Sequence, residues 1–306
     1  MSAGTLWVFP GQSSQAVGMG REAVERSARA AEFFTAAGEA IGVDLRELCW
    51  RTEMAVLTRT ENVQPALTAV TTATWIAMTD LGLVRRQDAD VFTGHSLGSL
   101  AAASAAGFLD PVDAVRLAAQ RGRIMASAPS GGGMLEILTP DDRGPAGQRE
   151  RGAALAERFG VDLAAVNGPT EIALAGEVAR LDQAAAELGA VARAVPVSNA
   201  FHSRYMAPVV PLWAQALDAI GLRATADRHL GSTTVQVATD AAGVRADLVR
   251  ALDEPVLWYD VLDRTHDLAA AAVVGPGRVM RRMMRSHLDG RPLRTFDNGD
   301  EGWLGS

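Results

Sequence analysis

The sequence contains no lysine and only one cysteine, Cys49. A single cysteine excludes an intramolecular disulfide and a cysteine-rich metal site, so we expect no bound metal and a reducing compartment. The chain also has no run of about 20 apolar residues, and no basic N-terminal segment followed by an apolar one. These absences predict a cytoplasmic protein without a membrane partner.

The chain also has no excess of positive charge, because the net charge is -7 and the isoelectric point is near 5.3. A nucleic-acid surface requires a concentration of basic side chains, so nucleic acid is not expected as a partner. What is present is a chain of 306 residues, of which 48% are hydrophobic and 21% are charged. This length and composition predict a globular enzyme with one large core and a smaller second unit.

Short apolar runs alternate with helical patterns near both ends of the chain. Leu6 to Phe9 and Ala89 to Thr93 are followed by proline or glycine, as buried strands often are. A third strand of this kind is expected from Ala269 to Val274. Asp110 and Pro111 supply an N-cap and a first-turn proline for one of the helices. The pattern predicts a large α/β domain.

The middle of the chain has a different order of elements. Between Met134 and Val197 the patterns follow the order strand, helix, strand, strand, helix, strand, which is the ferredoxin-like arrangement. The glycine-rich stretch from Pro129 to Gly133 is a suitable connection into this unit. We therefore predict an α/β fold in which a small ferredoxin-like (βαββαβ) subdomain, residues 129–197, is inserted into a large α/β subdomain, residues 1–128 and 198–306.

Ser96 lies in the pentapeptide Gly94-His95-Ser96-Leu97-Gly98, which matches G-x-S-x-G between an expected strand and an expected helix. The two glycines allow the sharp turn that exposes a serine hydroxyl, and the amides at the helix N-terminus can stabilise an oxyanion. The pattern predicts a nucleophilic serine. A serine that only caps a helix in a glycine-rich turn is the alternative that these five residues leave open.

A nucleophilic serine needs a base, and the chain has five histidines. His95 is adjacent to the serine and is expected to point away from it. His229, His266 and His287 lie in polar or arginine-flanked segments, which predict a surface position. His202 lies where the small subdomain returns to the large one, and a loop there can reach a cleft between domains. Position alone leaves open whether His202 is the base or a capping or solvated histidine.

Six fragments, taken in order along nearly the whole chain, resemble motifs of the malonyl-CoA:acyl carrier protein transacylase family, which includes the acyltransferase domains of polyketide synthases. They are Phe9 to Gln15 (F-P-G-Q-G-S-Q in the family), Gly94 to Gly98 (G-H-S-x-G), Gln120 to Gly122 (R-G), Asn167 to Pro169 (N-x-P), Val197 to Ser203 (V-S-x-A-F-H-S) and Gly275 to Gly277 (G-P-G). The resemblance implies an α/β-hydrolase-like large subdomain, malonyl-CoA as the donor, a phosphopantetheinylated acyl carrier protein as the acceptor, and no permanently bound cofactor.

The resemblance also implies roles for residues of the reaction centre. Ser96 is the nucleophile of a ping-pong reaction, and His202 is its general base and acid. The backbone amides of Gln12 and Leu97 form the oxyanion hole. A backbone carbonyl orients the histidine in place of an acidic side chain, and the carbonyl of Ala251 is in the matching position, close before Pro255 to Trp258.

Arg121 stands out on its predicted helix, where it shares a face with Leu117, Ile124 and Met125. A guanidinium carried into apolar surroundings needs a partner, although an arginine that reaches solvent or pairs with an internal acid is the other possibility. The family resemblance implies that Arg121 binds the free carboxylate of a malonyl group through two parallel hydrogen bonds.

The resemblance implies further residues of the substrate site. Phe201 would fill the space that an α-methyl group needs, which favours malonyl over methylmalonyl. The run from Ala200 to Met206 resembles free-standing acyltransferases that serve a polyketide synthase in trans. The remaining expected substrate contacts are Met125, Asn167 and Asn199.

Two residues depart from the family pattern, because Ser99 replaces a usual glutamate and Ser13 a usual glycine. Each could reshape the entrance, so transfer of an unusual acyl group between carrier proteins stays open. A serine thioesterase or hydrolase of the α/β-hydrolase type also stays open, as does an inactive scaffold that binds carrier proteins. A basic patch on the last predicted helix is expected either to dock the acidic carrier protein or to be a solvated face. It comprises Arg278, Arg281, Arg282 and Arg285.

Overall fold

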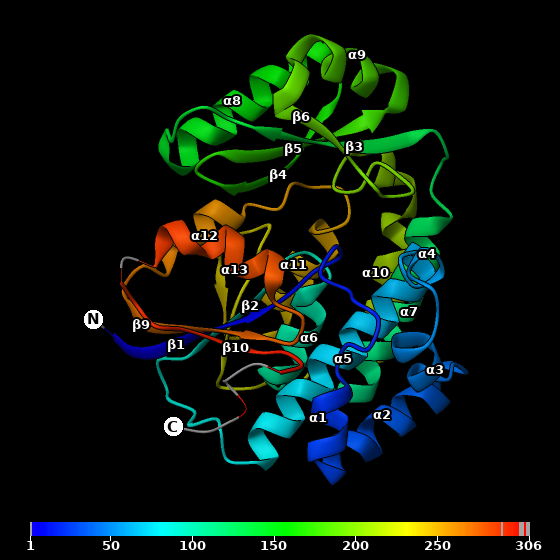
Figure 1. Cartoon of the computed structure of the whole chain (residues 1–306), viewed down its shortest axis with the longest axis vertical. Helices are drawn as coiled ribbons and strands as arrows, with labels where there is room; N and C mark the ends of the chain where they lie inside the picture. The colour runs from blue at the N-terminus through cyan, green and yellow to red at the C-terminus, as the bar shows by residue number, and fades with distance from the viewer. Residues whose placement is uncertain (1, 289, 300–302, 304–306) are drawn as a thin grey trace.

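The computed structural model describes residues 2–288, 290–299 and 303. A six-stranded sheet in the order β10-β9-β1-β2-β7-β8 forms the centre of the large subdomain (Figure 1). The neighbouring strands pair in parallel, except for β7 and β8 at one edge. The strands are β1 (Ser2–Phe9), β2 (Val91–Gly94), β7 (Arg228–Leu230), β8 (Val237–Ala238), β9 (Leu268–Val274) and β10 (Leu293–Phe296).

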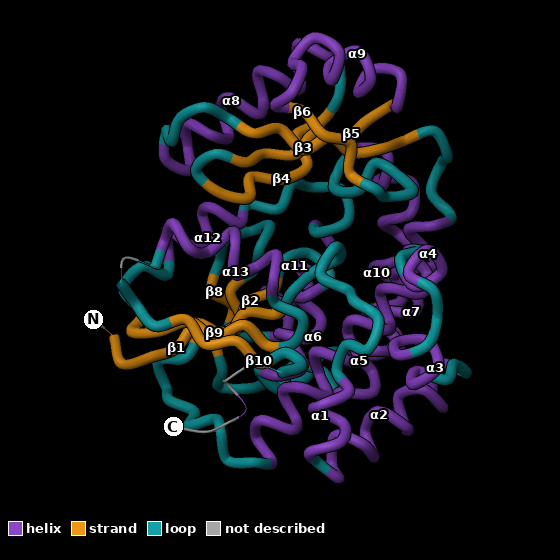
Figure 2. The backbone as a smooth tube through the Cα atoms, viewed as in Figure 1, coloured by secondary structure: helices purple, strands orange, loops and turns teal. Residues whose placement is uncertain are grey.

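Helices cover both faces of this sheet, as a mostly parallel sheet requires (Figure 2). Strand β1 shows why, because Trp7 and Phe9 belong to one hydrophobic core and Leu6 and Val8 to another. The helices of the large subdomain are α1 (Arg21–Arg26), α2 (Ala28–Ile41), α3 (Leu45–Trp50), α4 (Met54–Leu57), α5 (Thr60–Asp80), α6 (Gly98–Ala105), α7 (Pro111–Ala126), α10 (Val210–Ile220), α11 (Ala241–Arg250), α12 (Trp258–Arg264) and α13 (Arg278–Met284).

Helix α7 begins as the sequence predicts. The side chain of Asp110 accepts a hydrogen bond of 3.0 Å from the amide of Val112, and Pro111 occupies the first turn. The helix then packs along α5, whose residues are buried over most of its length. This packing brings the buried side chains of Gln64 on α5 and Arg121 on α7 together.

The small subdomain has the predicted βαββαβ order, and the predicted fold class is confirmed. Its antiparallel sheet has the order β4-β5-β3-β6, with α8 and α9 on the face that points away from the large subdomain (Figure 1). Its elements are β3 (Gly132–Leu138), α8 (Gly144–Phe159), β4 (Asp162–Gly168), β5 (Glu171–Glu177), α9 (Val178–Leu188) and β6 (Ala192–Val195). All lie within residues 129–197. The outer limits predicted for the large subdomain, residues 1 and 306, lie outside the described residues.

The two subdomains share backbone hydrogen bonds at Val256. Its carbonyl accepts a bond of 2.9 Å from the amide of Val166, and its amide donates one of 3.0 Å to the carbonyl of Ala164. Val256 thus adds one residue of backbone to the edge of strand β4, in parallel orientation. We call this pairing the seam.

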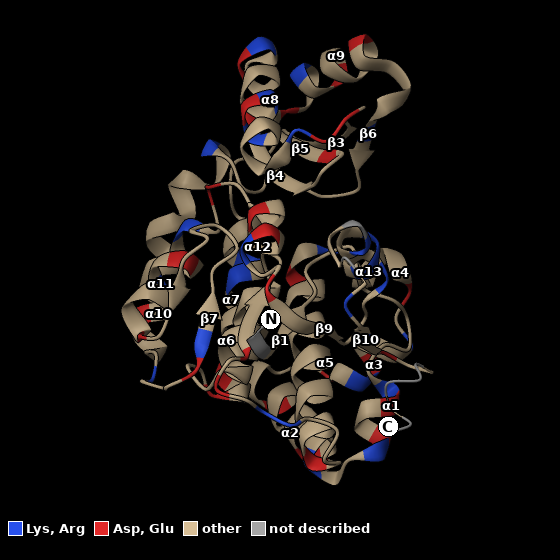
Figure 3. Cartoon of the chain, turned by 90° about the vertical axis from the view of Figure 1, so that its left-hand side faces the viewer, with Lys and Arg blue, Asp and Glu red and all other residues tan. Residues whose placement is uncertain are grey.

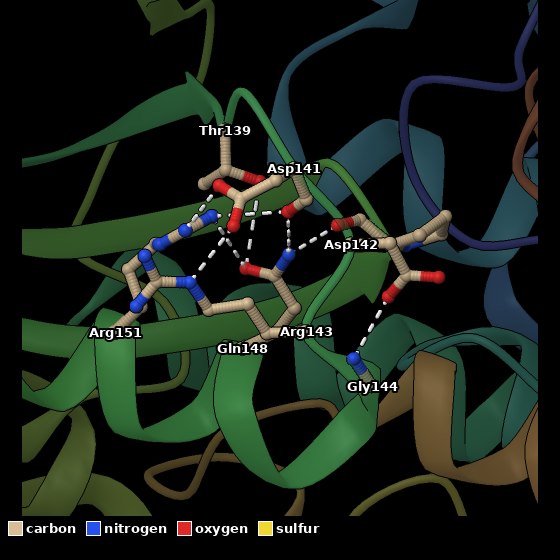
Figure 4. A network of polar contacts seen from close by, with 8 residues as sticks. Thr139, Asp141, Asp142, Arg143, Gly144, Gln148 and Arg151 are labelled. Atoms are coloured by element: carbon tan, nitrogen blue, oxygen red, sulfur yellow. Dashed lines mark hydrogen bonds and ion pairs between the residues drawn. The ribbon is translucent and has the colours of Figure 1, made fainter.

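A polar network beside the seam fixes the loop between β3 and α8 (Figure 4). Both carboxylate oxygens of Asp141 bind arginines, at 2.9 Å from Arg143 and 2.5 Å from Arg151. Asp142 accepts bonds of 2.8 Å from the amide of Gly144 and from the hydroxyl of Tyr259 on α12. The loop is therefore attached to the large subdomain by side chains as well as by the seam.

Several elements were not predicted from the sequence, and one histidine was misplaced. The unpredicted helices and strands include β7, β8, β10, α3, α4, α11 and α12. His229 lies on β7 with no exposed surface, so its predicted surface position is wrong. The strand is only three residues long and begins with an arginine, so its composition resembled that of a loop. After Ser203 the chain forms a 3-10 turn, Arg204–Val209, and α10 begins at Val210.

Candidate active site

Ser96 sits on a strained turn between β2 and α6. Its φ angle is 51°, in the left-handed region that a side chain disfavours. A Cβ atom on Gly94 would lie 2.0 Å from the backbone carbon of Gly98, and one on Gly98 would lie 2.0 Å from the carbonyl oxygen of Phe9. Both glycines are needed because three backbone segments approach closely here.

The loop after β1 packs against this turn and presents its own backbone. A Cβ atom on Gly11 would lie 2.4 Å from the carbonyl oxygen of His95, and the amide of His95 donates a bond of 3.1 Å to Phe9. The amides of Gln12 and Leu97 have no hydrogen-bond acceptor within the described part of the chain. Both backbone N–H groups are therefore available to donate hydrogen bonds to a ligand, one from the loop after β1 and one from the turn before α6.

His202 reaches Ser96 from the other end of the chain. Its Nε2 atom lies 2.9 Å from the Ser96 hydroxyl oxygen, and its ring is buried. Burial, followed by the charges of Arg121 and His95, lowers the pKa of His202 to about 3. Since the ring is neutral at neutral pH, its Nε2 atom can accept the serine proton when Nδ1 carries the other hydrogen.

The other ring nitrogen of His202 faces backbone. The carbonyls of Ala251 and Glu254 both favour the protonated ring, and so raise its pKa against the larger effect of burial. Neither forms a well-aligned hydrogen bond with Nδ1 in the described structure. Ala251 therefore lies close to the ring, its role in orienting His202 stays a prediction, and Glu254 supplies a second carbonyl to which no sequence motif pointed.

Arg121 is 2% exposed and is the third side chain at the serine. Its guanidinium donates bonds of 3.3 Å to the Ser96 hydroxyl, 3.5 Å to the carbonyl of Ala251 and 3.0 Å to the side chain of Gln64. Burial lowers the pKa of Arg121 to about 10, so it stays charged at neutral pH. No acidic side chain among the described residues pairs with it.

A buried cation without an anion is costly, and a bound anionic ligand would offset that cost. Gln64, which was not predicted as a site residue, is fully buried and holds Arg121. Its amide nitrogen also lies 3.3 Å from the sulfur of Met125 and 3.5 Å from the side-chain oxygen of Gln12. Within residues 63–78 of α5, every residue except Gln64 is apolar or threonine, and that was the signal available in the sequence.

A cavity of about 200 Å³ opens beside Ser96 and His202, between the two subdomains. Met125 and Phe201 line it, as does Asn167 from the small subdomain. All three residues therefore lie beside the reaction centre, and their contact with a substrate stays a prediction.

Asn199 does not line this cavity, and its polar atoms are occupied elsewhere. Its amide nitrogen donates to the carbonyls of Ala128 (3.4 Å) and Pro129 (3.0 Å), and its oxygen accepts a bond of 2.8 Å from the amide of Ala200. The side chain therefore holds together the two chain segments that connect the subdomains. This placement does not support the expected contact with substrate.

The outer part of the cavity is lined by a polar chain that begins beside Ser96. His95 turns away from the serine, as expected, and its Nε2 atom lies 3.0 Å from the side-chain oxygen of Asn167. Asn167 donates a bond of 2.9 Å to Glu171, and Arg282 on α13 forms an ion pair of 3.1 Å with the same carboxylate. Glu136 on β3 lies 3.9 Å from Arg282. No sequence motif pointed to Glu136 or Glu171.

The predicted basic patch lies on and around α13, where Figure 3 shows basic residues. All four of its arginines line a second cavity of about 420 Å³, which we call the outer cavity, and Arg282 also lines the cavity beside Ser96, where it is paired with acids. That larger cavity contains no serine or histidine among its lining residues. Its arginines are Arg278, Arg281, Arg282 and Arg285.

The two departures from the family pattern have different surroundings. Ser13 lines the cavity and has a φ of 76°, a conformation that glycine adopts without strain. Ser99 is fully buried and donates a bond of 2.9 Å to the carbonyl of Gly94. Only Ser13 is therefore in a position to alter the entrance.

Comparisons with known proteins agree on one family. Residues 6–276 match the family described as acyl transferase domain. The chain is 34% identical over 301 residues to the malonyl CoA-acyl carrier protein transacylase of Synechocystis, covering 97% of this chain and 98% of that one. It is 32% identical to a phenolphthiocerol synthesis polyketide synthase of Mycobacterium marinum, of which the match spans only 13%.

Solved structures give the same result. An acyl carrier protein S-malonyltransferase from Vibrio cholerae superposes with a TM-score of 0.86 at 28% identity, covering 99% of this chain and 100% of that one. A malonyl-transacylase in complex with its type II polyketide synthase acyl-carrier protein has a TM-score of 0.83 at 26% identity, covering 95% and 94%.

Neither a metal-binding cluster nor a membrane-spanning helix is found among the described residues. No group of three or more histidine, cysteine, aspartate or glutamate side chains is arranged to hold a metal ion there. In the same part of the chain, no helix has the length and apolar character that crossing a membrane requires.

Proposed function

Because this chain belongs to the family of acyl transferase domains, we propose that it transfers a malonyl group from coenzyme A to the phosphopantetheine thiol of an acyl carrier protein. The similarity to a polyketide synthase and to a transacylase that serves one supports a role in polyketide synthesis, in trans. We place the reaction in the cytoplasm, as the sequence predicts. Coenzyme A enters as the thioester substrate.

The surroundings of Arg121 carry this proposal. Its guanidinium touches the Ser96 hydroxyl at 3.3 Å and has no acidic partner in the described structure. An acyl group with a second carboxylate can reach Arg121 while its thioester carbon lies at Ser96. The planar guanidinium can then bind that carboxylate through two hydrogen bonds. An acetyl group offers no such contact.

The first half-reaction forms an acyl-serine. The Ser96 hydroxyl gives its proton to Nε2 of His202 while its oxygen attacks the thioester carbon. The resulting oxyanion is stabilised by the free amides of Gln12 and Leu97. When the carbon–sulfur bond breaks, Nε2 returns the proton to the sulfur, and coenzyme A leaves as a thiol.

The second half-reaction reverses the roles. The carrier thiol gives its proton to Nε2 of His202, and its sulfur attacks the acyl-serine carbon. The carbon–oxygen bond then breaks, and Ser96 recovers its proton from the histidine. A bound malonyl carboxylate offsets the charge of Arg121, which is one cause of the low pKa of His202. Binding of the correct donor therefore makes the histidine a stronger base.

The test is a panel of malonyl-, methylmalonyl-, ethylmalonyl- and acetyl-CoA, followed by intact mass spectrometry of the protein. We expect a malonyl adduct that disappears when phosphopantetheinylated carrier protein is added, with the carrier gaining the same mass. Phe201 and Met125 limit the space for an α-substituent, so the two larger donors should label more slowly. Free malonate without an acylated carrier would indicate a hydrolase, and no adduct would indicate a scaffold.

Carrier docking at Arg278, Arg281 and Arg285 is a separate part of the proposal. These side chains surround the outer cavity and can attract an acidic partner. Reversing Arg278 and Arg281 to glutamate should raise the Michaelis constant for the carrier and leave that for malonyl-CoA much less affected. The matched control is Arg29→Glu, on α2, whose side chain is 72% exposed. An unchanged Michaelis constant for the carrier would remove the docking surface.

A further inference from the structure

The active-site cavity has charged lining residues at its mouth. They are Glu136 on β3, Glu171 on β5 and Arg282 on α13, which we call the mouth residues. Their side chains are 25%, 14% and 58% exposed, respectively, whereas Arg121 is 2% exposed. Exposure therefore increases from Arg121 towards Arg282, which marks the side of the cavity that opens to solvent.

The cavity is too small to enclose a thioester substrate completely. Its volume of about 200 Å³ is below the roughly 300 to 1,000 Å³ of pockets that enclose drug-sized ligands. Once the acyl carbon lies at Ser96, the pantetheine arm attached to the sulfur must leave through the mouth. The arm then passes between the small sheet and α13, where the mouth residues lie.

The chemistry of the mouth matches that of the arm. Pantetheine has two amide groups and a hydroxyl, separated by methylene groups. Carboxylates accept hydrogen bonds from amide N–H groups, and a guanidinium donates to amide carbonyls. The methylene groups would contact the apolar side chains that line the cavity between the charged ones. These are Met134, Ala173, Val195, Val279, Met280 and Met283.

The charges at the mouth are only partly balanced within the protein. Arg282 is the one cation shared by Glu136 and Glu171 among the cavity-lining residues. Burial, followed by the neighbouring carboxylate of Glu136, raises the pKa of Glu171. Hydrogen-bond donors on a ligand would relieve this repulsion.

We propose that Glu136, Glu171 and Arg282 form a subsite that binds the pantetheine arm common to coenzyme A and the carrier protein. The inference rests on the proposed thioester chemistry at Ser96 and adds the residues that hold the arm. By holding it, the mouth residues set the position of the thioester carbon relative to the serine.

The experiment compares two malonyl donors that differ only in the arm. One is malonyl-pantetheine, and the other is the S-ethyl thioester of malonate, which has no amide. The rate of Ser96 labelling is followed by intact mass spectrometry with the unaltered protein and with Glu171→Ala. We expect the variant to lose about 10- to 100-fold in kcat/KM with malonyl-pantetheine and less than about twofold with the S-ethyl donor.

Three variants keep the result interpretable. Glu171→Gln retains an acceptor for the arm and should recover part of the loss. Glu136→Ala, at the more exposed glutamate, should show the same donor dependence if Glu171→Ala folds poorly. Glu177→Ala removes an exposed glutamate from the far end of β5 and should behave as the unaltered protein with both donors.

Each outcome has one meaning. An equal loss with both donors overturns the subsite, because Glu171 would then act on the reaction centre through Asn167 and His95. No loss with either donor overturns it as well. Absence of a malonyl adduct when the unaltered protein is given malonyl-CoA contradicts the proposed function itself, and so is distinguishable from failure of the subsite.

Discussion

The two ends of the active-site cavity differ in what holds their residues in place: the backbone at the inner end and side-chain pairing at the mouth. At the inner end, Ser96 and His202 both have positive φ angles, and the glycines around the serine have no room for a side chain. At the mouth, Glu136, Glu171 and Arg282 come from two strands and a helix with ordinary backbone and are held by side-chain pairing.

This difference decides what a sequence can reveal. A strained or close-packed backbone restricts the residues that fit, so the inner end leaves motifs such as G-x-S-x-G. Side-chain pairing between distant strands leaves no local pattern, so the mouth is visible only in the structure. The difference between the two ends also predicts the effect of substitutions. Substitutions at the inner end should abolish acyl transfer, whereas substitutions at the mouth should alter how well particular donors are used.

Ser96→Ala should have the largest effect of any single change. Without the hydroxyl no acyl-serine can form, and intact mass spectrometry should detect no malonyl adduct. The matched control is Ser99→Ala, three residues further on, which removes a buried hydroxyl bonded to Gly94 but no reacting atom. The adduct should still form in that variant. A malonyl adduct on Ser96→Ala would place the nucleophile elsewhere and contradict the difference between the two ends.

Arg121→Ala should be next in size. A malonyl carboxylate left without its buried partner costs about 3 kcal/mol or more, which corresponds to at least about a 100-fold loss in kcat/KM for malonyl-CoA. Acetyl-CoA has no carboxylate, so the preference should move towards it. Arg123→Ala, on the exposed side of the same helix, is the control. An unchanged malonyl preference in Arg121→Ala would contradict the assignment.

The pH dependence tests the state of His202. Because its pKa is lowered to about 3, the rate of Ser96 labelling should not fall near the ordinary histidine value of 6.5 but only at more acidic pH. Arg121→Ala removes one cause of the low pKa, so the decline measured with acetyl-CoA should begin at higher pH. A profile that falls at pH 6.5 in the unaltered protein would contradict burial of a neutral ring.

The same shift predicts how stability depends on pH. The unfolded chain takes up a proton at His202 near pH 6.5, whereas the folded protein does so only near 3. The contribution of the neutral histidine to the free energy of unfolding is therefore fully present above pH 6.5 and is lost as the pH falls towards 3. Replacing His202 with glutamine should flatten this part of a denaturation series.

Ser13→Gly should have the smallest effect, and it should stabilise the protein, whereas the changes above impair it. Removing the side chain from a φ of 76° relieves backbone strain, so we expect the free energy of unfolding to rise by about 1 kcal/mol. Chemical denaturation measures the change, with Ser14→Gly as the neighbouring control. A loss of stability would show that the Ser13 side chain makes a contact that outweighs the strain.

Much of the fold could be predicted because its signals are local. The alternation of strands and helices, the inserted βαββαβ unit and the Asp110 cap all depend on residues close together in the chain. The strands β7 and β8 are too short for periodicity to show, and β10 follows a segment rich in arginine. Their positions are set by pairing with β2 and β9, which is tertiary information.

In the candidate site, too, the residues in local motifs could be predicted and those placed by tertiary contacts could not. Ser96, His202 and Arg121 were predicted and are brought together by the structure. Gln64 was missed because its role depends on α7 lying beside α5. Asn199 was expected to contact substrate because of its place in a motif, but its side chain holds backbone.

The seam at Val256 has a consequence for catalysis. A hinge that swung the small subdomain outward would sever both backbone hydrogen bonds of that residue at once. We therefore expect a rigid aperture of constant width during turnover. The thioester carbon of either substrate then has to reach Ser96 between subdomains whose relative position changes little.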